Sequence, residues 1–237
     1  MQIAYRKLRI ANCYSPKGCH CERSEAILMY YYPIFLNLQE RRVVVIGGGR
    51  LAEEKVEGLL ATGARVRVIA LTVSARLEEL AAAGQIEHVE REYQEGDLEG
   101  AFLAISTIGE RARNERIFEE ANARNIAVNV VDDPQHCSFI APSILRRGDL
   151  TIAVSTSGKA PAVAVRLRQQ LEEQIGEEYA RFLEIAGTLR APLAARYPDF
   201  ETRKRLWYEL VDSDVLELLR AGDEAGTRQR IAEIMGI

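Results

Sequence analysis

The stretch that decides the fold is residues 41–71, "RRVVVIGGGRLAEEKVEGLLATGARVRVIAL". Its first apolar run, 43–46, contains only β-branched residues, which is typical of a parallel strand covered on both faces. A run of glycines follows, and apolar residues then recur at helical spacing until Gly63 ends the helix. A second apolar run, 66–69, closes the unit. The stretch therefore predicts a strand, a glycine turn, a helix and a second strand.

The glycine turn matches the fingerprint G-x-G-x-x-G/A through Gly47, Gly49 and Ala52. The first position permits the tight turn, the second lets a pyrophosphate approach the backbone, and the third lets the helix pack closely on the strand. The helix N-terminus would then face the anion. A tight turn in a domain that binds no cofactor is the alternative. Because the turn lies between a buried strand and an amphipathic helix, the sequence favours dinucleotide binding.

We expect a cofactor to contact the glycine turn and the carboxyl ends of the neighbouring strands, where ligands bind on such sheets. The expected contact residues are Gly47, Gly48, Gly49, Arg50, Leu51, Leu71, Thr72 and Thr107. The second strand runs into Leu71 and Thr72, without the Asp or Glu that usually holds the adenosine ribose. The sequence therefore does not decide between NAD and NADP.

Strands and helices continue to alternate as far as residue 132, with strands predicted at 86–91, 101–107 and 126–132. This alternation predicts an α/β fold with a Rossmann-like, doubly wound parallel sheet. The strand "TIAVS" (151–155) has no place in that sheet, so we expect it to pair with a second copy across a dimer axis. A long helix and a helical remainder follow, which we expect Pro192 and Pro198 to break into separate helices.

These patterns predict four segments. They are an extension at 1–28, an NAD-binding Rossmann-like domain at 29–141, a small dimerisation domain at 142–171 and a helical domain at 172–237. The extension carries a net charge of +3, which leaves −7 on the remainder. It holds Cys13, Cys19, His20 and Cys21. Metal binding is one interpretation, but one residue between paired cysteines is fewer than a zinc site normally has. We predict a disordered extension, or an upstream start before Met29 that the cell does not use.

The composition of the chain excludes several classes of protein. No apolar run is long enough to cross a bilayer, and the formal charge of −4 gives no reason to expect nucleic acid as a partner. Cys137 is the only cysteine after residue 28, so a disulfide framework is not predicted. These features favour a cytoplasmic protein that binds a small molecule.

Two adjacent carboxylates lie in the stretch "NVVDDPQHCSFIAPS" (129–143). A solvated turn is the plain interpretation, because Asp and Pro are ordinary turn residues. However, Asp132 falls at the carboxyl edge of the sheet, where the cofactor is expected. Neighbouring residues of a strand point to opposite faces, so we expect only one of Asp132 and Asp133 to face a site. His136 is open to three interpretations: a base, a transient metal ligand or a surface histidine.

Together, the glycine-turn stretch, "NVVDDPQHCSFIAPSILRRGDLTIAVSTSGKAPAVA" and the helical tail resemble the precorrin-2 dehydrogenase family, the dehydrogenase and ferrochelatase module of sirohaem synthase. The resemblance runs from about Tyr31 to the C-terminus and implies a homodimer. It implies NAD-dependent oxidation of precorrin-2 to sirohydrochlorin and, in some members, insertion of ferrous iron to give sirohaem. It also implies that Asp132 is catalytic. Thr156, between Ser155 and Ser157, occupies the position of a phosphorylatable serine of the family.

Several questions stay open at this level. One alternative is a dehydrogenase that leaves iron insertion to another protein, and another is an NAD-sensing module without turnover. The polycarboxylate substrate would need cations on an acidic chain, and no resident protein-metal site is predicted. The candidate cations are Arg111, Arg113, Arg146, Arg147 and Lys159.

Overall fold

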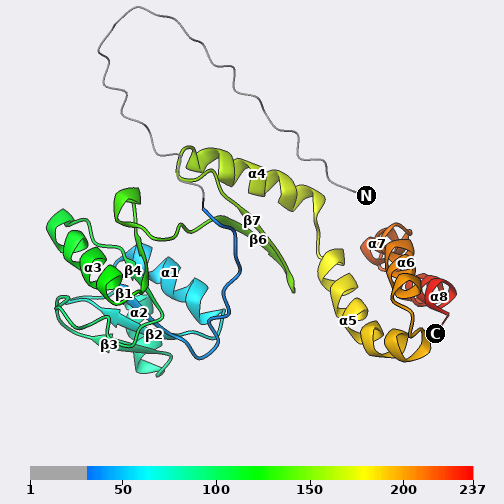
Figure 1. Cartoon of the computed structure of the whole chain (residues 1–237), viewed down its shortest axis with the longest axis horizontal. Coiled ribbons are helices and arrows are strands. Elements are labelled where there is room, and N and C mark those ends of the chain that lie inside the picture. Colours follow the sequence, from blue (N-terminus) through cyan, green and yellow to red (C-terminus); the bar gives the residue numbers. More distant parts are fainter. Residues whose placement is uncertain (1–30, 237) are drawn as a thin grey trace, which may run out of the picture. The chain divides into compact units, whose positions relative to one another are not determined.

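A five-stranded parallel sheet forms the first part of the described chain (Figure 1). The structure is a computed structural model that describes residues 31–236. The strands are β1 Arg42–Ile46, β2 Arg65–Ile69, β3 Ile86–Val89, β4 Leu103–Ser106 and β5 Ala127–Val130. They lie in the order β3-β2-β1-β4-β5, and every neighbouring pair is parallel. Because the chain crosses to both sides of β1, the predicted doubly wound sheet is confirmed.

The sheet is buried on both faces. Successive residues of β1 point to opposite sides, and each side belongs to a different core. Val43 and Val45 belong to a core shared with α1 (Arg50–Leu60) and α2 (Ala75–Ala82). Val44 and Ile46 belong to a second core, which includes apolar residues of α3 (Arg111–Ala123). The run of β-branched residues in β1 therefore serves two cores at once. Burial of this kind contributes about 25 cal/mol per Å² of apolar surface.

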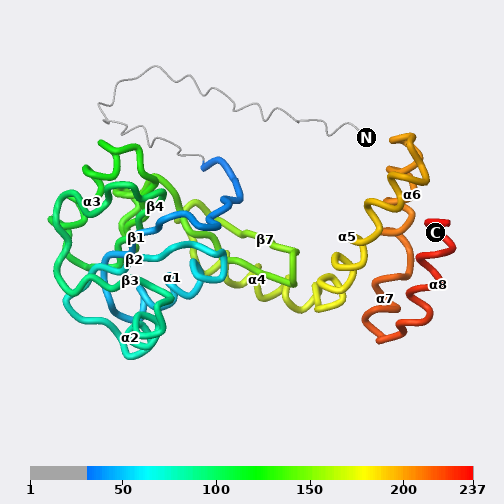
Figure 2. The backbone as a smooth tube through the Cα atoms, turned by 90° about the horizontal axis from the view of Figure 1, so that it is seen from below, coloured from blue at the N-terminus to red at the C-terminus, as the bar shows by residue number. Residues whose placement is uncertain are grey.

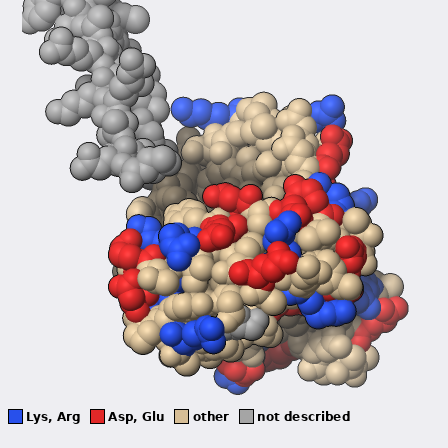
Figure 3. Space-filling view, turned by 90° about the vertical axis from the view of Figure 1, so that its right-hand side faces the viewer, with Lys and Arg blue, Asp and Glu red and all other residues tan. Residues whose placement is uncertain are grey.

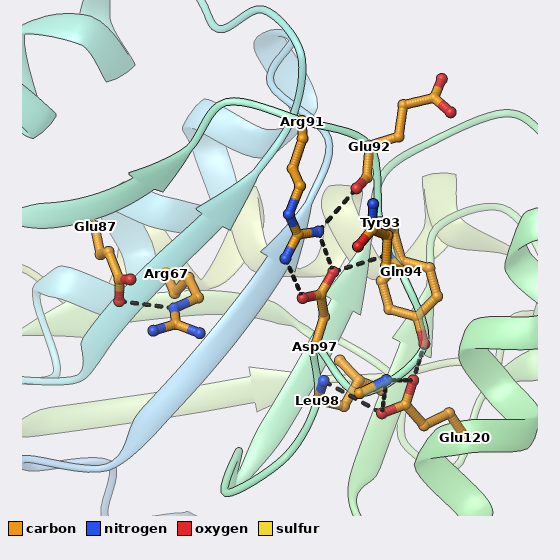
Figure 4. Close-up of polar contacts among 10 residues, drawn as sticks. Arg67, Glu87, Arg91, Glu92, Tyr93, Gln94, Asp97, Leu98 and Glu120 are labelled. Carbon is orange, nitrogen blue, oxygen red and sulfur yellow. Dashed lines mark hydrogen bonds and ion pairs between the residues drawn. The ribbon is translucent and has the colours of Figure 1, made fainter.

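Two carboxylates of low exposure fix the connection between β3 and β4 (Figure 4). Arg91 donates hydrogen bonds of 2.7 and 2.6 Å to the two oxygens of Asp97, and these bonds hold the pKa of Asp97 below its ordinary value. Glu120 of α3 accepts hydrogen bonds from the Tyr93 hydroxyl and from the backbone N–H of Gly96. Burial, followed by the hydrogen bond to Glu120, raises the pKa of Tyr93. The connection is therefore tied to α3 through charged and polar contacts.

A β-hairpin follows the sheet and corrects one prediction. β6 (Ser143–Arg147) and β7 (Leu150–Val154) are antiparallel partners in a two-stranded sheet of their own. The strand predicted at 151–155 therefore has a partner within its own chain. The sequence pattern missed β6 because its polar and charged residues do not alternate clearly with apolar ones. Gly148 adopts φ +53° in the turn between the strands, a conformation that suits glycine. The hairpin leaves the other edge of β7 without a strand partner in the described residues.

Helices make up the rest of the described chain. They are α4 Pro161–Gln174, α5 Glu178–Arg196, α6 Phe200–Val211, α7 Val215–Arg220 and α8 Glu224–Met235. The tail from α5 to α8 has its own core, which includes Leu193, Leu210 and Met235, and α6 and α8 lie side by side (Figures 1 and 2). Pro198 separates α5 from α6 as predicted, but Pro192 lies inside α5, which corrects the second predicted break. A proline removes one helical hydrogen bond, and packing around Leu193 offsets that loss.

Charged side chains of both signs are interleaved on the face seen in Figure 3. In the helical tail, many charged side chains form ion pairs, such as Arg230 with Asp214 at 2.7 Å. No helix among the described residues is long and apolar enough to cross a membrane. The cysteine and histidine cluster of the predicted extension 1–28 lies outside the described residues.

Candidate functional site

The glycine turn is tightly packed at Gly47 and Gly48 and open at Gly49. Gly47 adopts φ +112°, and a Cβ there would lie 2.3 Å from the Thr107 hydroxyl oxygen. A Cβ on Gly48 would lie 2.1 Å from the Thr72 carbonyl oxygen. By contrast, a Cβ on Gly49, the N-cap of α1, would meet no atom within 4 Å. The turn therefore offers open space at the N-terminus of a helix, where backbone N–H groups favour an anion. This geometry fits the pyrophosphate of a dinucleotide.

The strand ends that surround this turn meet as expected for a parallel sheet. The backbone N–H of Gly47 donates to the Ile69 carbonyl at 2.9 Å. The Thr107 hydroxyl donates to the Ile46 carbonyl at 3.1 Å, which joins the ends of β4 and β1. The remaining predicted contact residues are all exposed: Arg50, Leu51, Leu71 and Thr72. The fold thus places the predicted residues at one edge, and their contacts with a cofactor stay predictions.

Asp132 lies in a turn rather than at the end of a strand. β5 ends at Val130, so the strand predicted for 126–132 is shorter than expected. The backbone N–H of Asp133 donates to the Val130 carbonyl at 3.2 Å, and Asp132 adopts φ +63°. Val131 donates its N–H to the Ser106 carbonyl at 2.9 Å, so the turn lies beside the end of β4. Asp132 is exposed at the carboxyl edge of the sheet.

A cavity of about 530 Å³ opens beside this turn. Its walls come from the turn after β5, the segment before β6, the polar turn after β7 and the start of α4. Asp132, Thr156 and Lys55 of α1 are among the lining residues. Ser155 and Ser157, the neighbours of Thr156, also line it. The cavity therefore joins the predicted catalytic carboxylate to the hydroxyl-rich turn of the second motif.

Asp133 and His136 do not line this cavity. His136 Nδ1 lies 2.7 Å from a carboxylate oxygen of Asp133, and both side chains are largely covered. Only one of the two adjacent aspartates thus faces the cavity, as expected. The reason differs from the predicted one, because a turn and not strand alternation separates the two side chains. His136 has the side-chain partner that an exposed turn histidine would lack.

The predicted substrate-binding cations lie elsewhere. None of Arg111, Arg113, Arg146, Arg147 and Lys159 lines the cavity. Arg113 is paired with Glu92 and Glu110 at 3.0 and 2.9 Å, and Arg147 donates to the Ile175 carbonyl at 3.0 Å. Sequence reasoning missed Lys55, which lines the cavity. The one feature of the sequence that could have indicated Lys55 is its position on the helix that follows the glycine turn.

A second hollow, of about 610 Å³, lies at the opposite, amino-terminal edge of the sheet. Arg65 and Arg67 line it, and each is paired with a glutamate, at 3.7 and 2.7 Å. It contains none of the strand-end groups that bind ligands on parallel sheets. The carboxyl edge is therefore the better candidate site, although its cavity is the smaller one.

Three family models match the described chain in sequence order. Residues 34–143 match a family described as putative NAD(P)-binding. Residues 147–174 match the central region of sirohaem biosynthesis proteins, and residues 178–235 match the sirohaem synthase dimerisation region. The chain thus carries an NAD(P)-binding domain. The region described as the dimerisation region corresponds to the helical tail.

Curated relatives and a solved structure agree with these matches. The chain is 39% identical to a siroheme synthase of Photobacterium profundum over 87% of its length, and 38% identical to one of Stutzerimonas stutzeri over 86%. It spans 44% of each relative, less than half of their length. The solved structure "SirC, precorrin-2 dehydrogenase" is similar with a TM-score of 0.71 at 25% identity, over 87% of this chain and 100% of that one. The chain therefore belongs to the sirohaem synthase family, within the part that comprises the NAD(P)-binding, central and dimerisation regions.

Proposed function

We propose that this chain oxidises precorrin-2 to sirohydrochlorin with NAD as the oxidant. The observation that carries this proposal is the position of Asp132, which lines a cavity at the same carboxyl edge of the sheet as the open glycine turn. The likeness to a precorrin-2 dehydrogenase along that protein's whole length supports the choice of substrate.

The residues of the chain have separate tasks in this reaction. Oxidation of the tetrapyrrole removes a hydride and a proton, and bound NAD supplies the hydride acceptor. The N-terminus of α1 and the open face of Gly49 hold the cofactor's pyrophosphate. Asp132 accepts the proton as general base. Lys55 binds a carboxylate of the substrate, since it is a cation in the cavity lining.

Insertion of ferrous iron into sirohydrochlorin is a second proposed activity, with iron as a substrate. It is supported by likeness to siroheme synthases, and Asp132 would take the pyrrole protons that the metal displaces. A dehydrogenase without this activity remains the alternative. An NAD-sensing module without turnover is the other alternative, and it would not need a carboxylate at Asp132.

We also propose that the working protein is a cytoplasmic homodimer. The predicted division at 29–141, 142–171 and 172–237 is kept, with pairing through the 142–171 segment. The open edge of β7 and the exposed side chains of Ile144, Val163 and Val165 support this surface. Because the turn after β7 lines the cavity, a second copy on this surface would lie close to the site.

Anaerobic incubation of the protein with precorrin-2 and NAD tests the proposed reaction. Sirohydrochlorin absorbance should rise together with NADH absorbance, and both rates should fall by about a hundredfold or more in the Asp132→Asn variant. Ferrous iron is then added to sirohydrochlorin in a separate reaction without NAD. NAD binding without any sirohydrochlorin would favour the sensing module, and oxidation without iron insertion would favour the single-activity dehydrogenase.

A further inference from the structure

The turn that carries Asp132 holds a residue other than glycine in the left-handed conformation. Asp132 adopts φ +63°, a region where L-residues are disfavoured by roughly 1–2 kcal/mol. Such a conformation persists only where the surrounding structure over-determines it. One hydrogen bond spans the turn: the backbone N–H of Asp133 donates to the Val130 carbonyl at 3.2 Å. Aspartate visits this region more readily than most residues other than glycine, so the strain is modest, and further contacts around the turn add to this hydrogen bond.

The side chains that follow Asp132 supply these contacts. His136 Nδ1 lies 2.7 Å from Asp133 Oδ2, and the backbone N–H of His136 donates to the Asp133 carbonyl at 3.1 Å. An ionised carboxylate only accepts hydrogen bonds, so Nδ1 of His136 carries a hydrogen and donates it in this contact. The two side chains are only 14% and 27% exposed. The ring of His136 also packs edge-on against Phe118 of α3, with centroids 5.2 Å apart. The turn is thus anchored to a helix of the main core.

The thiol of Cys137 links both ends of the turn through hydrogen bonds with Val130 and Asp133. Its sulfur lies 3.2 Å from the carbonyl oxygens of Val130 and Asp133, and it accepts the backbone N–H of Val130 at 3.2 Å. Burial raises the pKa of this thiol, so it stays a donor near neutral pH. Asp133 is therefore held through both its backbone and its side chain. Asp132 itself keeps an exposed side chain at the cavity.

We propose that Asp133 and His136 are positioning residues, which form a pair that fixes the turn so that Asp132 presents its carboxylate to the cavity. Neither side chain lines the cavity, so the pair acts through Asp132 and not on the substrate. The proposal rests on the proposed function for its link to turnover. The holding of the turn itself does not depend on that function.

Two matched pairs of variants separate positioning from proton transfer. His136→Asn places an amide donor near the position of Nδ1 but cannot carry a proton at neutral pH, whereas His136→Leu fills similar space and donates nothing. Asp133→Asn keeps an oxygen acceptor for Nδ1–H, and Asp133→Ala keeps none. The melting temperature shows whether each variant folds. If a substitution at His136 prevents folding, the Asp133 variants still test the proposal.

The measurements are amide hydrogen exchange of the 130–137 segment and steady-state kinetics with precorrin-2 and NAD. The Leu and Ala variants should exchange several-fold faster in this segment only, and kcat should fall by about 10- to 100-fold, the scale for a reacting group displaced by about 1 Å. The KM for NAD should stay unchanged. Both Asn variants should keep the protection and most of kcat.

The other outcomes decide either against the positioning pair or against the proposed function. Unchanged exchange in the Leu and Ala variants overturns it, and so does faster exchange with unchanged kcat, because the contact would then be structural only. If His136→Asn is as inactive as His136→Leu although its segment stays protected, the imidazole itself takes part in the chemistry. If the unaltered protein does not oxidise precorrin-2, the proposed function fails, and hydrogen exchange alone decides whether the pair holds the turn.

Discussion

Lys55 of α1 and Asp132 of the turn after β5 line the same cavity, although they belong to opposite ends of the sheet domain's sequence. One is a cation and the other a carboxylate. The doubly wound order brings them together, because β1 lies next to β4 and β4 next to β5. A polycarboxylate substrate would meet both a binding charge and a base in one space.

Removal of the charge at Lys55 should weaken substrate binding. We expect Lys55→Met to raise the KM for precorrin-2 about tenfold, the scale for loss of one charge-assisted hydrogen bond, with no change in the Kd for NAD. Lys55→Arg should restore most of the affinity. Lys159→Met is the control, because Lys159 is exposed and does not line the cavity. A larger effect at Lys159 than at Lys55 would place the substrate elsewhere.

The loss of the carboxylate at Asp132 should remove the base and leave the cofactor site intact. Asp132→Asn should lower the rate of dehydrogenation by about a hundredfold or more, the scale for a lost general base, with unchanged NAD titration. Asp133→Asn should cost much less, because its amide oxygen still accepts from His136. Iron insertion measured from sirohydrochlorin then shows whether both reactions share Asp132. Full activity of Asp132→Asn would remove the central support of the proposed enzyme.

A side chain at Gly49 should block the cofactor without disturbing the fold. A Cβ at this position meets no protein atom within 4 Å, and its φ of −84° suits valine. Gly49→Val should therefore abolish NAD binding in a fluorescence titration while the melting temperature stays close to that of the parent. Gly58→Val, also in open space on the same helix, is the control. Equal NAD affinity of parent and Gly49→Val would show that the dinucleotide binds elsewhere.

Light scattering should give twice the chain mass of 26.5 kDa. The double variant Ile144→Asp, Val163→Asp should give the single mass if pairing uses the 142–171 segment. The matched variant Phe200→Asp, Tyr208→Asp alters exposed apolar side chains of α6 and should leave the dimer intact. Dissociation by the second pair alone would assign the interface to the helical tail that the family description calls a dimerisation region. A stable, active monomeric parent would exclude a dimer.

Acid should remove the contribution of Asp97 to stability. The hydrogen bonds from Arg91 lower the folded-state pKa of Asp97, so its contribution is complete above the ordinary value of 3.8 and is lost as pH falls through the lower folded value. Asp97→Asn should lower the free energy of urea unfolding by about 1 kcal/mol at pH 7, a modest figure because Arg91 is partly exposed. The difference should shrink below pH 3.8. The exposed Asp149→Asn serves as control, and a difference that grows in acid would contradict the assignment.

The sequence by itself determined the parallel sheet and its glycine turn. Both depend on local features: the β-branched run 43–46 needs cover on two faces, and the glycine positions permit a turn that other residues would obstruct. The same local logic placed Asp132 at the carboxyl edge, where the structure also has it. The continuation of α5 through Pro192 was not predicted, because packing around Leu193 offsets a local cost that the sequence pattern counts as a break.

Only the tertiary structure decided which charges share the site. Lys55 lines the cavity and the predicted arginines do not, because lining depends on how strands far apart in sequence are ordered in the sheet. The contact between His136 and Asp133, the left-handed turn at Asp132 and the packing of the His136 ring against Phe118 of α3 were likewise not readable from local periodicity. The partner of β7 is decided in the same way, since β6 lacks a local strand pattern and forms by hydrogen bonding across the hairpin. Local periodicity predicts the elements, whereas long-range packing fixes which side chains meet.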